Sequence, residues 1–217
     1  MLVRRPATAS RYNREMSRLA LLLCCTLAAG AVQNSTSKSA TAEIVKSIGV
    51  FTAPITIEVF SDFQCPSCKL LYERTLRPLT DDYVAKGRVY LIHRDFPLPQ
   101  HEHAREAACY ACAAGRIGKY ETACDVLFRQ QEHWAADGKV ADTVCAALSP
   151  SEAKQVRALA KDPQIAASVD HDIQLGTAAG VQKTPTMVIT YKEQRYPVVG
   201  AVNYDLLRRF LDQLLSK

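Results

Sequence analysis

Two cysteines in the sequence Cys65-Pro66-Ser67-Cys68 lie where a strand pattern gives way to a helical one. The preceding residues 55–60 alternate and are rich in β-branched and aromatic types, which predicts a strand. The following residues, as far as about Lys86, predict a helix. This junction constrains the fold because it places both sulfurs at the end of a strand, in the first turn of a helix.

A helix start favours a reactive cysteine. Unpaired N–H groups and the helix dipole stabilise an anion there, and Pro66 suits the first turn because it has no N–H to leave unpaired. A thiolate held in this way has a pKa of about 3.5–7.5, against about 8.5 for free cysteine. We therefore expect Cys65 to be the exposed, attacking sulfur, and Cys68, one turn further in, to resolve a mixed disulfide. Stabilising the reduced form would make the Cys65–Cys68 disulfide a stronger oxidant.

Two other interpretations of the motif stay open. The pair could be a permanent structural disulfide, although so tight a loop gains little from chain-entropy arguments. Cys65 and Cys68 could instead share a zinc ion with Cys109 and Cys112. The two pairs are further apart in the chain than the about 15–20 residues of common zinc ribbons.

The order of the other elements predicts the fold class. Strand patterns recur at residues 88–93, 186–190 and 195–199, and a final amphipathic helix begins at Asn203 or Asp205. Alanine is abundant and strand formers are scarce from His101 to about Val181, before the strand pattern at 186–190, which predicts four or five helices. We therefore expect an α/β chain with a thioredoxin fold, in which a helical subdomain is inserted after the second strand of the core.

Thr184-Pro185-Thr186 forms a second signal, directly before the strand pattern at 186–190. Proline cannot donate to a strand ladder, so Pro185 marks the edge of that strand. Only about 5–6% of X–Pro bonds in folded proteins are cis, so Pro185 alone predicts a trans bond. Its place in the order of elements, together with the cysteine pair upstream, makes a cis Thr184–Pro185 bond beside Cys65 the better prediction.

The first 31 residues have the composition of a secretory signal peptide. An Arg- and Ser-rich start is followed by the apolar run 19–32, which is shorter than the about 20 residues of a membrane-spanning helix and ends in small residues. An uncleaved anchor and lipidation of Cys24 or Cys25 stay open as alternatives. Cleavage near Ala31 would leave six cysteines, an even number that suits an oxidising compartment.

We divide the chain into four parts. These are a signal peptide (1–31), an N-terminal extension (32–53), a thioredoxin core (54–100 and 182–217) and a helical insertion (101–181). The net charge is +5, but the signal peptide holds most of the excess, and the rest is nearly neutral without a long basic run. Charge therefore gives no support for binding to nucleic acid.

These features together resemble the DsbA-like family of exported thiol–disulfide oxidoreductases, from about residue 54 to residue 215. The motifs that carry the resemblance are Val59-Phe60-Ser61-Asp62-Phe63-Gln64-Cys65-Pro66-Ser67-Cys68, Arg94-Asp95-Phe96-Pro97-Leu98, His103-Ala104 before an alanine-rich helix, and Gly180-Val181 through Thr184-Pro185-Thr186.

The resemblance implies an enzyme that donates its disulfide to folding clients. It implies that Cys65 is the nucleophile, Cys68 the resolving cysteine and Pro185 the cis-proline beside them. Substrate-binding roles fall to Thr184, Pro66 and Ser67. The implied partners are reduced, unfolded exported proteins and a membrane protein of the DsbB or VKOR type that reoxidises the pair. We expect a monomer in the periplasm or another extracytoplasmic space, with no cofactor or metal.

Two rival functions stay open, and one residue departs from the family pattern. The same site could serve a disulfide isomerase or reductase, or the chain could be a non-enzymatic thioredoxin-fold protein that binds metal or another partner. Relatives often have an acid six residues before the first cysteine, where this chain has Val59. The neighbouring Glu58 should point to the other face of its strand, so the proton acceptor for Cys68 stays open.

A second CxxC, at Cys109 and Cys112, lies in the middle of a predicted helix. We expect these two to be small core residues or partners in a structural disulfide; a redox relay to Cys65 is a further alternative. With Cys124 and Cys145 they allow three full pairings, among which the sequence does not choose. The five histidines are scattered, which predicts surface or capping roles.

Overall fold

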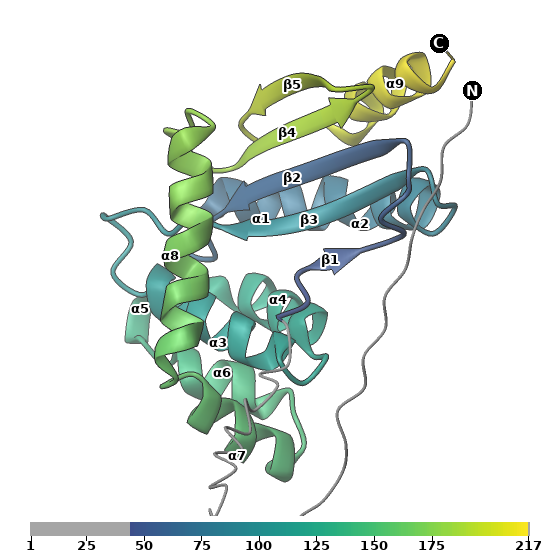
Figure 1. Cartoon of the computed structure of the whole chain (residues 1–217). Helices are drawn as coiled ribbons and strands as arrows, with labels where there is room; N and C mark the ends of the chain where they lie inside the picture. Colours follow the sequence, from purple (N-terminus) through teal and green to yellow (C-terminus); the bar gives the residue numbers. More distant parts are fainter. Residues whose placement is uncertain (1–43, 217) are drawn as a thin grey trace, which may run out of the picture. The chain divides into compact units, whose positions relative to one another are not determined.

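The structure is a computed structural model that describes residues 44–216. Its centre is a five-stranded sheet with the strand order β1-β3-β2-β4-β5 (Figure 1). The strands are β1 (Ser47–Ile48), β2 (Ile55–Ser61), β3 (Val89–Asp95), β4 (Thr186–Tyr191) and β5 (Gln194–Val199). β2 and β3 run parallel, whereas the pairs β1–β3, β2–β4 and β4–β5 are antiparallel.

The central strand β2 is buried on both faces because helices cover the sheet on two sides. Ile57 and Val59 belong to the main core, and Phe60, whose side chain points the other way, belongs to a smaller cluster with Val188. The pairing of β2 with β3 sets Val59 opposite His93. The end of β2, from which the cysteine motif follows, is therefore held firmly in the core.

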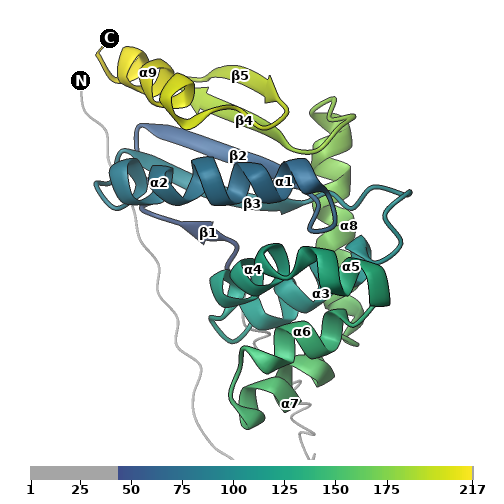
Figure 2. The ribbon, with the colours of Figure 1, turned by 180° about the vertical axis from the view of Figure 1, so that it is seen from behind.

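One helical stretch and the C-terminal helix cover the same face of the sheet (Figure 2). The stretch consists of α1 (Pro66–Leu71), η1 (Tyr72–Leu76), α2 (Arg77–Leu79) and η2 (Thr80–Val84), and the C-terminal helix is α9 (Tyr204–Leu215). The segments η1 and η2 are π-helical turns on either side of Pro78, which has no N–H for a regular helix bond.

Six helices lie between β3 and β4, more than the four or five expected. They are α3 (Ala104–Gly115), α4 (Tyr120–Arg129), α5 (Gln131–Asp137), α6 (Val140–Ala146), α7 (Pro150–Leu159) and α8 (Pro163–Ala178). The break between α4 and α5 falls at Gln130, whose backbone is not helical (φ −102°, ψ 17°). No glycine or proline marks this position, so no local sequence signal predicts the break.

Helix α8 leads from the insertion back to β4 and packs close to the end of β2 (Figure 1). A side chain at Gly176 would come within 2.6 Å of Phe96 and 2.9 Å of Phe60. Glycine is therefore required for this approach. The expected α/β class, with helices inserted after the second strand of the core, is confirmed.

The predicted signal peptide at 1–31, with Cys24 and Cys25, lies outside the described residues. Within residues 44–216, no helix is both long and apolar enough to cross a membrane.

Candidate active site

The cysteine motif lies at the junction of β2 and α1, as the sequence predicts. Cys65 is the residue before α1, with extended backbone angles (φ −80°, ψ 121°), and Pro66 occupies the first turn. The carbonyl of Cys65 accepts the first helical bonds, from the N–H groups of Cys68 at 3.0 Å and Lys69 at 3.2 Å. Pro66 and Ser67 are exposed at the tip of the junction.

Cys65 is less exposed than we expected from the sequence. Its residue surface is 7% exposed, against 1% for Cys68. The reason is the loop before β4, where the Thr184 carbonyl lies 3.5 Å from the Cys65 sulfur and accepts a hydrogen bond from it when Cys65 is a protonated thiol. The Cys65 sulfur therefore lies between this loop and the exposed Pro66-Ser67 tip.

The two sulfurs differ in how readily they lose a proton. The Cys68 thiol donates to the Cys65 sulfur and lowers the pKa of Cys65 to about 5; backbone N–H groups of Cys68 and Ser67 add to this effect. Burial, and then the adjacent Cys65 sulfur, raise the pKa of Cys68 above its ordinary value. The Asp62 N–H donates to the Cys68 sulfur at 3.4 Å. At neutral pH the reduced site therefore holds a Cys65 thiolate beside a Cys68 thiol.

The Thr184–Pro185 peptide bond is cis, and Pro185 is buried beside the cysteines. Thr186 Oγ1 donates to the Lys183 carbonyl at 2.7 Å and closes the turn before β4. The Thr184 hydroxyl is buried, and among the described residues it has no hydrogen-bond partner. This buried polar atom belongs to the same residue whose carbonyl lies next to the Cys65 sulfur.

The loop between β2 and α1 is held by the helical insertion through contacts that the sequence did not reveal. The Asp62 carboxylate accepts from the Leu98 N–H at 2.8 Å and contacts Nδ1 of His101 at 2.7 Å. The Gln64 side chain accepts from the His103 N–H at 2.8 Å. Gln131, in α5, donates to the carbonyls of Phe63 and Cys65. No spacing in the sequence links these positions, which meet only in the folded chain.

Glu58 pairs with Arg94 rather than with the cysteines. Arg94 donates to Glu58 Oε1 through Nε at 3.0 Å and through a terminal nitrogen at 2.8 Å. Val59 is fully buried, with Glu58 on the other side of the strand. Glu58 therefore does not take the place of the acid that relatives have at Val59.

The second CxxC motif lies in α3 and carries no disulfide. All six described cysteines are free. Cys112 is buried and donates to Asp95 Oδ2 at 3.1 Å. Burial raises the pKa of Cys109, Cys112, Cys124 and Cys145, which makes these thiols poor nucleophiles at neutral pH.

A buried ion cluster joins the segment before β1 to the insertion. Lys46 Nζ lies 3.0 Å from Asp95 Oδ2 and also contacts Asp172, which accepts from the Asp95 N–H at 3.0 Å. Burial alone would lower the pKa of Lys46, but the carboxylates outweigh it and hold the pKa above its ordinary value. The lysine is therefore charged and stabilises two buried carboxylates.

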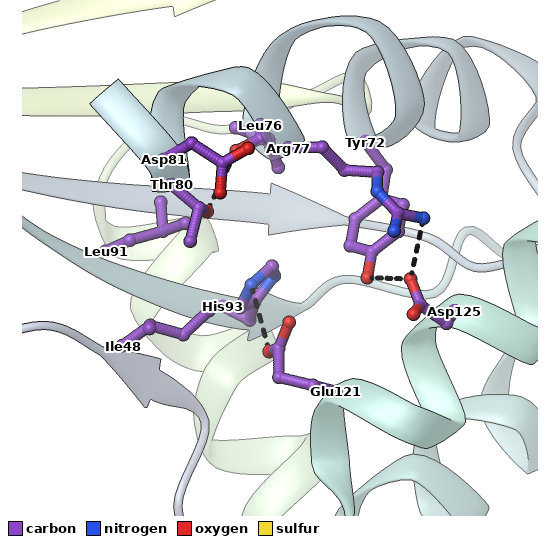
Figure 3. Close-up of a pocket in the computed structure, with 10 residues that line it drawn as sticks. All are labelled: Ile48, Tyr72, Leu76, Arg77, Thr80, Asp81, Leu91, His93, Glu121 and Asp125. Atoms are coloured by element: carbon purple, nitrogen blue, oxygen red, sulfur yellow. Dashed lines mark hydrogen bonds and ion pairs between the residues drawn. The ribbon is translucent and has the colours of Figure 1, made fainter. Parts of the chain in front are cut away.

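A cavity of about 200 Å³ opens between β3, η1 and α4 (Figure 3). The expectation of a surface or capping role was wrong for His93, which is 5% exposed and lies with Nε2 3.7 Å from Glu121 Oε1. Burial lowers the pKa of His93 to about 4 and raises the pKa of Glu121 to about 7. The lining includes neither Cys65 nor Cys68, so this cavity is separate from the cysteine site.

Nothing in the described part of the chain forms an evident metal centre. No group of three or more His, Cys, Asp or Glu side chains within residues 44–216 is arranged to hold a metal ion.

Comparisons with known proteins match this geometry. The family model described as Thioredoxin matches residues 40–213. The chain is 23% identical to the probable disulfide bond formation protein D of Bacillus anthracis, with 79% of each chain covered. It is 22% identical to the disulfide bond formation protein D of Bacillus subtilis, with 78% of this chain and 76% of the relative covered.

Solved structures show the same fold. The α-DsbA1 of Wolbachia pipientis has a TM-score of 0.64 at 19% identity, covering 78% of this chain and 89% of its own. Oxidised BdbD of Bacillus subtilis has a TM-score of 0.63 at 22% identity; the match covers 79% of this chain and 93% of BdbD. The family match, the fold and the cysteine site lead to one conclusion: the chain belongs to the thioredoxin family, as a thiol–disulfide oxidoreductase with the fold of the DsbA structures.

Proposed function

We propose that this oxidoreductase is an exported dithiol oxidase that donates the Cys65–Cys68 disulfide to folding client proteins. The observation that carries the proposal is the asymmetry of the reduced pair. The pKa of Cys65 is lowered to about 5, whereas that of Cys68 is raised. Because the thiolate stabilises the reduced form, reduction of the Cys65–Cys68 disulfide is favourable in free energy. The oxidised pair is therefore a strong oxidant.

The reaction is two thiol–disulfide exchanges. A client thiolate attacks the Cys65 sulfur of the oxidised pair, the Cys65–Cys68 bond breaks, and the Cys68 sulfur leaves with the electron pair and takes up a proton. A second client thiolate then attacks the client sulfur of this mixed disulfide and releases Cys65 as a thiolate. The client loses two electrons and two protons, and the enzyme pair is left reduced.

We assign substrate binding to the surfaces on either side of Cys65. The half-buried Thr184 and the exposed Pro66 and Ser67 flank the sulfur, with Pro185 fixing the loop beneath it. These groups offer polar contacts to an extended backbone without a deep, selective pocket. Such a surface suits many unfolded clients.

The setting follows from the sequence and from the family. From the signal-peptide pattern at 1–31, followed by an extension at 32–53, we propose that the protein acts in the periplasm or another extracytoplasmic space, and we propose that it is a monomer. We assign 54–100 and 182–217 to the catalytic core and 101–181 to the insertion. Because each turnover leaves the pair reduced, we propose a membrane partner of the DsbB or VKOR type that reoxidises it.

The proposal is tested by mixing the oxidised protein with a reduced, unfolded client that contains two cysteines. Loss of the Cys65–Cys68 disulfide should match the gain of a client disulfide. Cys65→Ala should abolish transfer, and Cys68→Ala, pre-loaded as a mixed disulfide at Cys65, should still release an oxidised client. Transfer that survives Cys65→Ala would overturn the proposal. Reduction of client disulfides without any oxidation would favour a reductase, and tight metal binding without redox cycling would favour a non-enzymatic protein.

A further inference from the structure

The turn that carries the reactive sulfur depends on a side chain from a distant part of the chain. Gln131 is the first residue of α5, which lies next to the start of α1 (Figure 2). Its Nε2 donates to the Phe63 carbonyl at 2.6 Å and to the Cys65 carbonyl at 3.1 Å. A primary amide has two N–H donors, so one side chain can satisfy both acceptors at once.

These two bonds are made in a buried setting, where they have no competitor from solvent. Gln131 is 4% exposed and Phe63 is 5% exposed. The Phe63 carbonyl takes no backbone hydrogen bond among those of the described loops, so Gln131 is the donor that satisfies it. A buried carbonyl without a donor is costly, which makes the turn favour the conformation that reaches Gln131.

The geometry of this turn decides where the sulfur lies. Cys65 is in an extended conformation directly before α1, and its sulfur faces Thr184 and the first N–H groups of the helix. A rotation of the Phe63–Cys65 backbone would move the sulfur away from the N–H groups of the helix start. We propose that Gln131 is a positioning residue of the active site: its amide fixes this backbone and thereby the position of the Cys65 sulfur over the helix start.

The position of Gln131 in the fold explains how the insertion takes part. The non-helical Gln130 ends α4 and begins α5, so that the next side chain turns inward to the loop. Phe128, in the last turn of α4, packs on Phe63 with ring centroids 5.0 Å apart. The α4–α5 junction therefore holds the same loop by an apolar contact, through Phe128, and by hydrogen bonds, through Gln131. Through these contacts the insertion fixes the backbone that carries the Cys65 sulfur.

The test compares two variants of Gln131 with a control in the same helix. Gln131→Met keeps the length of the side chain and removes both donors, whereas Gln131→Asn keeps the amide but shortens its reach. Trp134→Phe is the control: Trp134 is fully buried in the same helix, and its side chain donates to the Leu127 carbonyl at 2.7 Å rather than to the Phe63 or Cys65 carbonyl. Ultraviolet absorbance of the thiolate in the reduced proteins reports the pKa of Cys65, and circular dichroism reports folding.

Gln131→Met should raise the pKa of Cys65 by about one unit, which lowers the ratio of thiolate to thiol tenfold at a given pH. Gln131→Asn should raise this pKa by less. Trp134→Phe should lower the melting temperature and leave the pKa of Cys65 unchanged. Folded Gln131 variants with the wild-type pKa would overturn the inference, and so would an equal shift in Trp134→Phe. Should Gln131→Met fail to fold, Gln131→Asn decides by the same criterion.

The inference rests on the proposed function, since it concerns the sulfur that the function makes reactive. The two fail in different ways. A wild-type protein that does not oxidise clients refutes the proposed function, whatever the pKa of the variants. An unchanged pKa in the Gln131 variants refutes only the role of Gln131.

Discussion

Removal of the Cys68 thiol should weaken the Cys65 thiolate by an amount that the structure allows us to estimate. The hydrogen bond from the Cys68 side chain is the largest single cause of the low Cys65 pKa of about 5. A hydrogen bond to a charged group contributes about 1.5–3 kcal/mol, which corresponds to about 1–2 pKa units. The backbone donors of Cys68 and Ser67 stay in place in Cys68→Ala. The pKa of Cys65 in this variant should therefore be about 6–7.

The assay is an ultraviolet titration of the thiolate from about pH 3 to about pH 9, the range in which a perturbed cysteine ionises. A Cys65→Ala variant supplies the baseline of all other groups. The control is Cys145→Ala, because Cys145 contacts the Ala153 carbonyl and lies outside the cysteine site. A pKa that stays within about half a unit of the wild-type value in Cys68→Ala would refute this account of the thiolate. A wild-type pKa near the ordinary value of about 8.5 would refute it as well.

Three further predictions concern the titratable residues Glu121, His93 and Lys46, and each is checked by urea unfolding. Glu121→Gln should increase stability above pH 7 by about 1 kcal/mol: the pKa of the half-exposed Glu121 is raised to about 7, so wild-type stability falls as pH rises from about 4.5 to about 7. His93→Phe should remove the opposite slope, because the lowered pKa of about 4 makes wild-type stability fall by about 3 kcal/mol as pH drops from about 6.5 to about 4. An unchanged pH profile in either variant would contradict the corresponding prediction. Lys46→Met should cost about 3–5 kcal/mol, because Asp95 loses its cation and Asp172 keeps only Arg94, 3.3 Å away; a loss below about 1 kcal/mol would count against a charged cluster.

The parts of the fold that follow from local patterns were predictable from the sequence. The strand before Cys65 and the helix after it are encoded by alternation, apolar spacing and the proline in the first turn. The hairpin of β4 and β5 and the N-cap of α9 at Asn203 follow from equally local signals.

Features that depend on distant contacts could not be predicted in this way. Gln131 looks like any polar helix residue until the fold brings it under the Phe63 and Cys65 carbonyls. His93 lies in a strand whose buried face is decided by the helices packed on it, and only that packing shows that its ring is enclosed. The partial cover of Cys65 likewise comes from Thr184, far along the chain.

The reduction potential of the Cys65–Cys68 pair tests the central claim most directly. The purified protein is equilibrated in glutathione buffers of known potential, and the fraction with the disulfide is measured by alkylation of the free thiols. The stabilised Cys65 thiolate predicts an oxidising potential, above about −200 mV. A value near the about −270 mV of thioredoxin would contradict the claim that this chain is a donor of disulfides.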